Sequence, residues 1–219
     1  MRSGRDSSCA EKMEKRSLNI TRLTVGPAAE NCYIVRPEGG TQALVIDPGD
    51  SGDRILGKIR EQGLTPGAVL LTHGHFDHTG GLDAFSGVPV YLHPEDQDIL
   101  NDPERNAGFL AGDRRPRPEN TLPVRDGDAL SLCGMGVSVL HTPGHTKGSV
   151  CYLVDGQALF TGDTLFEAGF GRTDLYGGDE KALWQSLRKV LSLENDVPVY
   201  PGHGRATSVL RERRNLWNL

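Results

Sequence analysis

The chain has 219 residues, of which 37% are hydrophobic, and a formal net charge of −5 at pH 7. This length suits one domain with a single core, and the acidic balance argues against a broad surface for nucleic acid. No apolar run approaches the roughly 18 residues of a membrane-spanning helix. Residues 1–16 are charged and have no apolar segment, so we expect a poorly ordered tail rather than a signal peptide or anchor, followed by one domain at 17–219.

The cysteine pattern indicates a reducing compartment. The chain has four cysteines, at positions 9, 32, 133 and 151. They form no C-x-x-C motif and no dense disulfide framework. We therefore expect a cytoplasmic protein. The sequence is silent on its oligomeric state.

In the first half of the chain, short apolar runs alternate with helical spacing. Ile55 and Ile59 predict a helix over residues 52–62. The segment that begins at His93, "HPEDQDIL", has acidic residues where the first turn of a helix favours them. Residues 101–124 are rich in Pro, Arg, Asp and Gly and predict a long loop with room for a short helix. Strands are predicted at 20–25, 32–35, 43–46, 68–71 and 88–92.

The second half repeats this order of strands, helix and strand. The clearest helix spans residues 179–193, where apolar side chains form one stripe, and a terminal helix is predicted at 210–217. Two packed sheets with helices outside them would accommodate both halves, which is an α+β arrangement. Strands are predicted at 137–141, 149–154, 158–161 and 197–200.

The stretch "HGHFDH" contains three of the seven histidines of the chain. In an extended backbone, His73, His75 and Asp77 would lie on one side, and His78 would point elsewhere and reach a second ion. Imidazole and carboxylate ligands together suit zinc, manganese or iron. The alternative interpretation is a solvated polar loop.

Four further segments argue against that alternative. Asp47, His145, Asp163 and His203 each follow a predicted strand, in or beside a glycine-bearing turn. Such residues at the ends of core strands predict one site assembled at one edge of the fold.

The segments "DPGD", "THGHFDH", "TPGHT", "TGD" and "PGHG", in this order, resemble the motifs of the metallo-β-lactamase superfamily. The resemblance spans about residues 18–217 and implies a four-layer αββα sandwich of two mixed sheets, with a cleft for two metal ions. It implies that one ion is held by His73, His75 and His145. A second would be held by Asp77, His78 and His203, with Asp163 as the bridge. Zinc is the first expectation, and iron and manganese are the alternatives.

The resemblance also assigns supporting residues. Asp47 would hold a ligand from behind, and we expect the same of His141, whereas His93 is an ordinary histidine. We expect Asp77 and His203 to be catalytic. Two ions about 3.5–4 Å apart would supply hydroxide at neutral pH and polarise a carbonyl or phosphoryl oxygen, which predicts hydrolysis.

The segment from Phe166 to Asp179, "FEAGFGRTDLYGGD", resembles the corresponding loop of glyoxalase II. That resemblance implies a small thioester substrate such as S-lactoylglutathione. The chain departs from the family in stopping soon after His203, without the helical domain that contacts glutathione. Arg172 and Arg205 are then the cations expected to hold a substrate carboxylate, although Arg172 could instead pair with Asp174.

Three other functions remain open. Persulfide dioxygenases, which use one iron and O₂, share the "GRTD" segment but have cysteine and tyrosine where this chain has Phe170 and Arg205. A non-catalytic binding module would not need the complete ligand set. A nuclease would need a basic arm or clamp domain, and none is visible. We expect neither nucleic acid nor a membrane as a partner.

Overall fold

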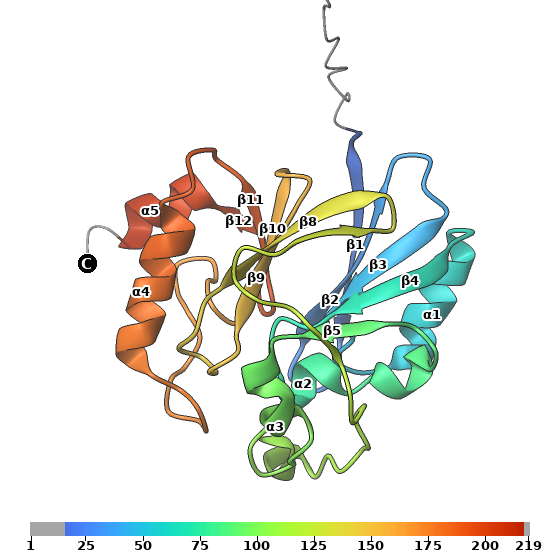
Figure 1. Cartoon of the computed structure of the whole chain (residues 1–219), viewed down its shortest axis with the longest axis horizontal. Helices are drawn as coiled ribbons and strands as arrows, with labels where there is room; N and C mark the ends of the chain where they lie inside the picture. The colour runs from blue at the N-terminus through green and yellow to red at the C-terminus, as the bar shows by residue number, and fades with distance from the viewer. Residues whose placement is uncertain (1–15, 217–219) are drawn as a thin grey trace, which may run out of the picture.

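The computed structural model describes residues 16–216. Within that part of the chain, two six-stranded sheets pack face to face, and helices lie outside them (Figure 1). The predicted tail at 1–16 falls almost wholly outside the described residues, as do residues 217–219. The expected four-layer αββα sandwich is confirmed.

The first sheet has the strand order β1-β2-β3-β4-β5-β6. The first three strands pair antiparallel, and β3 to β6 pair parallel, so the sheet is mixed. Its strands are β1 (Leu18–Val25), β2 (Glu30–Pro37), β3 (Gln42–Ile46), β4 (Thr65–Leu70), β5 (Val90–Leu92) and β6 (Leu122–Pro123).

The second sheet has the order β12-β11-β10-β9-β8-β7. It is also mixed, because β10 and β11 pair parallel and its other neighbours pair antiparallel. Its strands are β7 (Ala129–Leu132), β8 (Met135–His141), β9 (Val150–Val154), β10 (Ala158–Gly162), β11 (Pro198–Pro201) and β12 (Thr207–Ser208).

The helices cover the outer faces and the loop-bearing edge. The longer ones are α1 (Gly52–Glu61), α4 (Glu180–Leu191) and α5 (Val209–Leu216). Short turns of helix lie between β4 and β6: α2 (Phe76–Thr79), η1 (Leu82–Phe85), η2 (Pro94–Asp96), α3 (Gln97–Leu100) and η3 (Gly108–Ala111). None of the helices within residues 16–216 combines the length and apolar character needed to cross a membrane.

Alternation along the strands creates the layers. On β2, Tyr33 and Val35 face the core between the sheets, whereas Cys32 and Ile34 face the layer of α1. A continuous apolar run is what a strand buried on both faces requires. Tyr33 meets Phe160 of the other sheet edge-on at 5.2 Å between ring centroids. The two sheets are therefore joined by one apolar layer.

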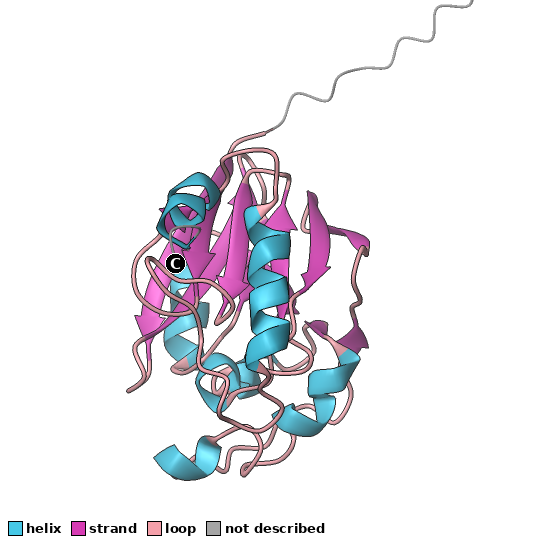
Figure 2. Ribbon diagram, turned by 90° about the vertical axis from the view of Figure 1, so that its left-hand side faces the viewer, coloured by secondary structure: helices cyan, strands magenta, loops and turns pink. Residues whose placement is uncertain are grey.

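The outer helices bury one apolar stripe each. Leu183 and Leu187 of α4 pack with Val199 of β11 on the outer face of the second sheet, where α4 and α5 lie (Figure 2). Asp179 caps α4 by accepting a hydrogen bond from the backbone N–H of Ala182 at 2.9 Å, a common way to start a helix. The predicted start of this helix was thus one residue early.

The short edge elements escaped prediction. β6 and β12 have two residues each, which is too short for a periodic pattern, and β7 has one apolar face only. The expected loop at 101–124 contains η3 and ends in β6. These elements form the rim of the sandwich rather than its core.

Candidate metal centre

Loops at one edge of the sandwich bring the seven predicted ligands together. β3 and β4 run parallel in the first sheet, and β10 and β11 run parallel in the second. Because the carboxyl ends of parallel strands meet at the same edge, residues that follow them converge. The loop between β8 and β9 adds His145.

Three imidazoles form the first cluster. The ligand-type atoms of His73, His75 and His145 lie within 4.8 Å of one another, and each residue is at most 3% exposed. The Nδ1 of His75 is 2.9 Å from the Nε2 of His145. The Nδ1–H of His145 donates to the carbonyl of Arg172 at 2.7 Å, which leaves its Nε2 lone pair free to bind an ion.

Burial keeps His73 and His75 of this cluster neutral. Desolvation, reinforced by the neighbouring imidazoles, lowers the pKa of His73 well below its ordinary value. Desolvation and His145 likewise lower the pKa of His75 to about 3. A metal ligand must be a neutral imidazole, so these two need lose no proton to bind.

The second cluster combines Asp77, His78 and His203. The Nε2 of His203 is 3.3 Å from the Oδ2 of Asp77. Burial opposes protonation of His78 and His203, but the neighbouring carboxylates outweigh it and raise the pKa of both. Asp77 and His203 are partly open to solvent, with side chains 18% and 27% exposed.

Asp163 lies between the two clusters. Its Oδ2 is 3.5 Å from the Nε2 of His145, and its Oδ1 is 3.3 Å from the Nε2 of His78. Burial works to raise the pKa of Asp163, but the charge of His78 dominates and the net pKa is lowered. A carboxylate that presents one oxygen to each cluster has the geometry of a bridge.

Buried polar atoms without partners test whether metal ions fit. The Nε2 atoms of His73 and His78 and the Oδ1 of Asp163 are buried without a hydrogen-bond partner within residues 16–216. A buried polar atom left unpaired costs about 1–3 kcal/mol, so such atoms require an explanation. Divalent ions at both clusters would pair these atoms, and the mixed nitrogen and oxygen donors suit zinc, iron or manganese.

The backbone of the histidine motif differs from the predicted one. The chain bends at Thr72 and His73, is extended at His75 and then turns into α2, where the N–H of His78 donates to the carbonyl of His75 at 3.1 Å. The grouping of Asp77 with His73 and His75 on one side was therefore wrong. The helical turn directs Asp77 to the second cluster, beside His78.

Asp47 holds the motif from behind. It accepts hydrogen bonds from the backbone N–H of Thr72 at 2.7 Å, from the Thr72 hydroxyl at 2.6 Å and from the Nδ1–H of His78 at 3.0 Å. The last bond fixes the tautomer of His78, so that its Nε2 faces Asp163. The close packing also needs Gly49, because a Cβ there would lie 1.7 Å from the carbonyl oxygen of Asp77.

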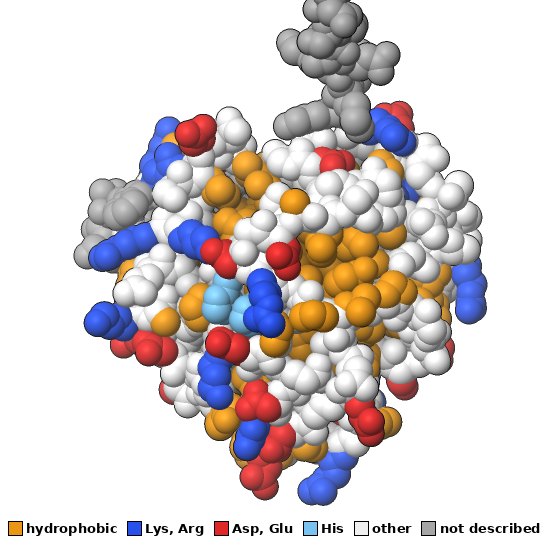
Figure 3. Space-filling model, viewed as in Figure 1, with side chains coloured by type: hydrophobic (Ala, Val, Ile, Leu, Met, Phe, Trp, Pro, Cys, Tyr) orange, Lys and Arg blue, Asp and Glu red, His pale blue; other side chains and the backbone are white. Residues whose placement is uncertain are grey.

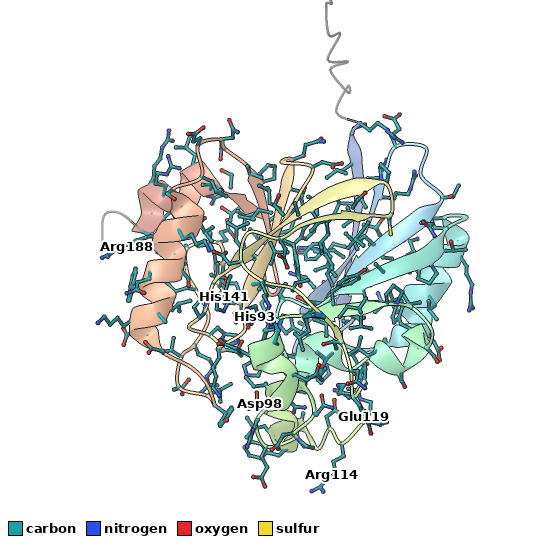
Figure 4. All side chains as sticks on the ribbon, viewed as in Figure 1. His93, Asp98, Arg114, Glu119, His141 and Arg188 are labelled. Carbon is teal, nitrogen blue, oxygen red and sulfur yellow. The ribbon has the colours of Figure 1, made fainter. Side chains whose placement is uncertain are left out.

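His141 does not bond to any of the seven ligands. Its Nε2–H donates to the carbonyl of Lys147 at 2.8 Å, in the loop that carries His145, and its ring stacks on His93 at 4.1 Å and 8°. Figure 4 labels His93 and His141, and in the same view Figure 3 shows histidine atoms at the surface in this region. Glu95 is close to both rings. Lone pairs lie in the ring planes, however, and those of two parallel stacked rings do not converge on one ion.

The two predicted substrate cations differ. Arg172 is held by Asp174 through two contacts of 2.6 and 2.7 Å, so the alternative interpretation of this residue applies. Arg205 is exposed beside His203 and forms no ion pair within residues 16–216. A pocket of about 290 Å³ adjoins Asp77, lined by Pro27, Phe76 and Arg114 among others.

Sequence reasoning missed Glu30 and Asp96. Both are buried, and burial raises the pKa of each carboxyl group. Neither carboxylate oxygen of Glu30 has a hydrogen-bond partner within residues 16–216, although its Oε1 is 3.9 Å from the Nδ1 of His78. Both residues lie outside the ligand motifs, so no local pattern marked them.

This chain is similar to known proteins over most of its length. The profile of the Metallo-beta-lactamase superfamily matches residues 25–203. "Probable metallo-hydrolase YqgX" of Bacillus subtilis is 42% identical over 88% of this chain and 93% of its own length. "Hydroxyacylglutathione hydrolase GloC" of Haemophilus influenzae is 34% identical over 90% of this chain and 96% of its own. The crystal structure of TTHA1623 in a di-iron-bound form is 38% identical, covers 91% of this chain and 100% of that one, and superposes with a TM-score of 0.82.

Proposed function

Because this chain belongs to the metallo-β-lactamase superfamily, we propose that it is a dinuclear metallohydrolase that cleaves a thioester such as S-lactoylglutathione. The observation that carries the proposal is the position of Asp163, with one oxygen toward each cluster. The identity to GloC over nearly the whole chain supports the substrate class.

In this proposal His73, His75 and His145 bind one ion. Asp77, His78 and His203 bind the second, and Asp163 contacts both. Zinc is the first expectation, and iron gains support from the di-iron relative. Bound ions would supply hydroxide at neutral pH and polarise the thioester carbonyl.

The residues around the ions determine how the substrate approaches. His73, His75 and His145 are closed to solvent, whereas Asp77 and His203 are open, so the thioester enters on the side of the second cluster. Asp77 and His203 then face the reacting carbonyl. As ligands of the second ion, these two residues would hold it at the entrance, which is the catalytic role we propose for this pair.

The thiol carrier is held from the same side. Of the two predicted cations, Arg205 forms no ion pair within residues 16–216, whereas Arg172 must leave Asp174 before it can bind a carboxylate. In this proposal Arg205 is the main contact to the remote part of the substrate, and such contacts are what an enzyme uses to orient it. We propose a high KM for S-lactoylglutathione and tolerance of other acyl-thiols.

The second candidate is an iron-dependent persulfide dioxygenase. The "GRTD" segment favours it, because the carbonyl of Arg172 holds His145 and so places this segment at the metal centre. The free thiols of Cys32, Cys133 and Cys151 support the cytoplasm as the compartment for either activity.

Elemental analysis of protein purified without added metal, run beside two assays, tests the proposal. We expect two ions per chain, hydrolysis of S-lactoylglutathione, and no oxygen uptake with glutathione persulfide. One iron per chain with oxygen uptake and no hydrolysis would replace the proposal by the dioxygenase. Metal-free protein that turns over neither substrate would favour a binding module.

A further inference from the structure

Asp96 lies at the junction of η2 and α3 and is completely buried. Its Oδ2 accepts hydrogen bonds from the backbone N–H of Gly74 at 2.8 Å and from the Thr146 hydroxyl at 2.7 Å. Its Oδ1 accepts one from the backbone N–H of Gly148 at 2.7 Å. Gly74 stands between His73 and His75, and Thr146 follows His145. One carboxylate therefore connects the two loops that form the first cluster.

We propose that Asp96 is a positioning residue, which locks the His73–His75 loop to the His145 loop and so fixes the geometry of the first cluster. The inference rests on the proposed metal binding but not on the proposed substrate. Its physical basis is that the two loops come from different sheets, after β4 and after β8, and that two glycine N–H groups and one hydroxyl are aimed at the same side chain.

Only a carboxylate satisfies all three donors. It accepts hydrogen bonds on both oxygens, whereas an asparagine amide accepts on one and donates from the other. In an Asp96→Asn variant, the amide N–H₂ would face either the N–H of Gly148 or the N–H of Gly74. At least one backbone donor would lose its partner, and the two loops would no longer be tied by the same group.

Close packing at both loops supports the same interpretation independently. A Cβ on Gly148 would lie 2.7 Å from the backbone nitrogen of Asp96, and one on Gly74 would lie 3.0 Å from its carbonyl oxygen. Both distances are shorter than ordinary contact, so the Asp96 segment fits only against glycine on each side. The Asp96 segment thus packs between the two loops and is hydrogen-bonded to both.

The test is a titration of the metal-free protein with Co²⁺, followed by visible absorption in competition with a chelator. We compare Asp96→Asn with Asp98→Asn, a matched change on α3 at an exposed residue (Figure 4). Its ion pairs, with Arg105 and with Lys147 of the His145 loop, are open to solvent and therefore weak. A His145→Ala variant supplies the spectrum of the second cluster alone.

For Asp96→Asn we expect binding at the first cluster to weaken by about 10–100-fold, the range seen when a supporting contact is lost. Binding at the second cluster should change by less than about twofold, and Asp98→Asn should match the wild type at both, within the same margin. Wild-type affinity at the first cluster, or equal weakening at both, would overturn the proposal.

Thr146→Val keeps the test decisive if Asp96→Asn fails to fold. This variant removes one of the three hydrogen bonds and retains a side chain of similar volume, so we expect a weakening of several-fold, again confined to the first cluster. An unchanged first cluster in Thr146→Val would contradict the proposal. Two bound ions without thioester hydrolysis would reject the proposed substrate and leave this inference standing.

Discussion

The two clusters share one loop and lie on either side of Asp163, yet they differ in the pKa of their histidines and in their access to solvent. The first consists of three imidazoles closed to solvent, two of which have a pKa lowered by burial. The second includes a carboxylate and two imidazoles whose pKa is raised against the effect of burial, and part of it faces solvent.

This difference shows that the groups around each histidine set its pKa. His75 and His78 are three residues apart and both buried. His78 is bonded to Asp47 and faces Asp163, whereas His75 faces His145. In the proposed function, the first cluster holds an ion away from solvent, and the second holds an ion where substrate can reach it.

The largest effect should come from removing one ligand from each cluster. His145→Ala should lose the first ion and reduce kcat/KM by more than the roughly 100-fold of a lost supporting contact. His203→Ala should also abolish most activity but keep the first ion. Ions per chain, from elemental analysis, distinguish the two variants.

His141→Ala is the matched control for His145→Ala. It removes only the hydrogen bond to the carbonyl of Lys147 and the stacking on His93, so we expect less than about a 10-fold loss of activity and no loss of metal. Equal loss of metal from both variants would mean that the assignment of His145 over His141 is wrong.

Asp47→Asn should weaken the second cluster by about 10–100-fold and leave the first nearly unchanged. Asn tolerates the left-handed backbone at this position, where φ is 49°, so the change tests the hydrogen bond to His78 rather than backbone strain. The measurement is competition with a chelator. A larger effect on the first cluster would indicate that the contact to Thr72 dominates.

Metal affinity should depend on pH more steeply at the second cluster than at the first. His73 and His75 are neutral near pH 7 because their pKa lies below 6.5, whereas His78 and His203, with a raised pKa, must release protons to bind. We expect affinity at the second cluster to rise with pH through neutrality, by about tenfold per unit for each proton released, and to level off above the raised pKa values. Calorimetric titration in buffers of different ionisation enthalpy counts these protons, and equal release at both clusters would contradict the comparison.

The smallest effects should come from the arginines on the open side. Arg205→Ala should raise KM several-fold with little change in kcat, because it removes uniform binding. Arg172→Ala should do so less, since its guanidinium is already occupied by Asp174. If KM stays micromolar in the variant that carries both changes, the thiol carrier binds elsewhere. Arg114→Ala, in the pocket beside Asp77, would then be the next variant to measure.

Much of this architecture could be predicted from the residues. The buried strands are apolar runs in the sequence, and the ligand motifs follow such runs. The two layers of strands and the common edge that carries the motifs could therefore be predicted. The grouping of His73 and His75 with His145, apart from Asp77, was implied by the family resemblance. The local pattern alone did not show it, because it depends on where the chain turns into α2.

Long-range contacts were beyond prediction for a different reason. Asp96 bonds to Gly74 and to Gly148, 22 and 52 residues away, and nothing in "HPEDQD" distinguishes it from its exposed neighbour Asp98. The ion pair of Arg172 with Asp174 was foreseen only as an alternative, since rotamers decide it. Tertiary packing selects among residues that look equivalent in sequence.

The seven proposed ligands lie in loops of both sheets, and this has a consequence for the stability of the fold. Ions bound between loops of the two sheets would act as cross-links across the open edge of the sandwich. An ion that binds only the native state adds about 2.7 kcal/mol to the free energy of unfolding at 100 times its Kd, and about 4.1 kcal/mol at 1,000 times. The melting temperature would then rise with the concentration of free ion. The fraction of folded protein would depend on the available metal as well as on the packing of the core.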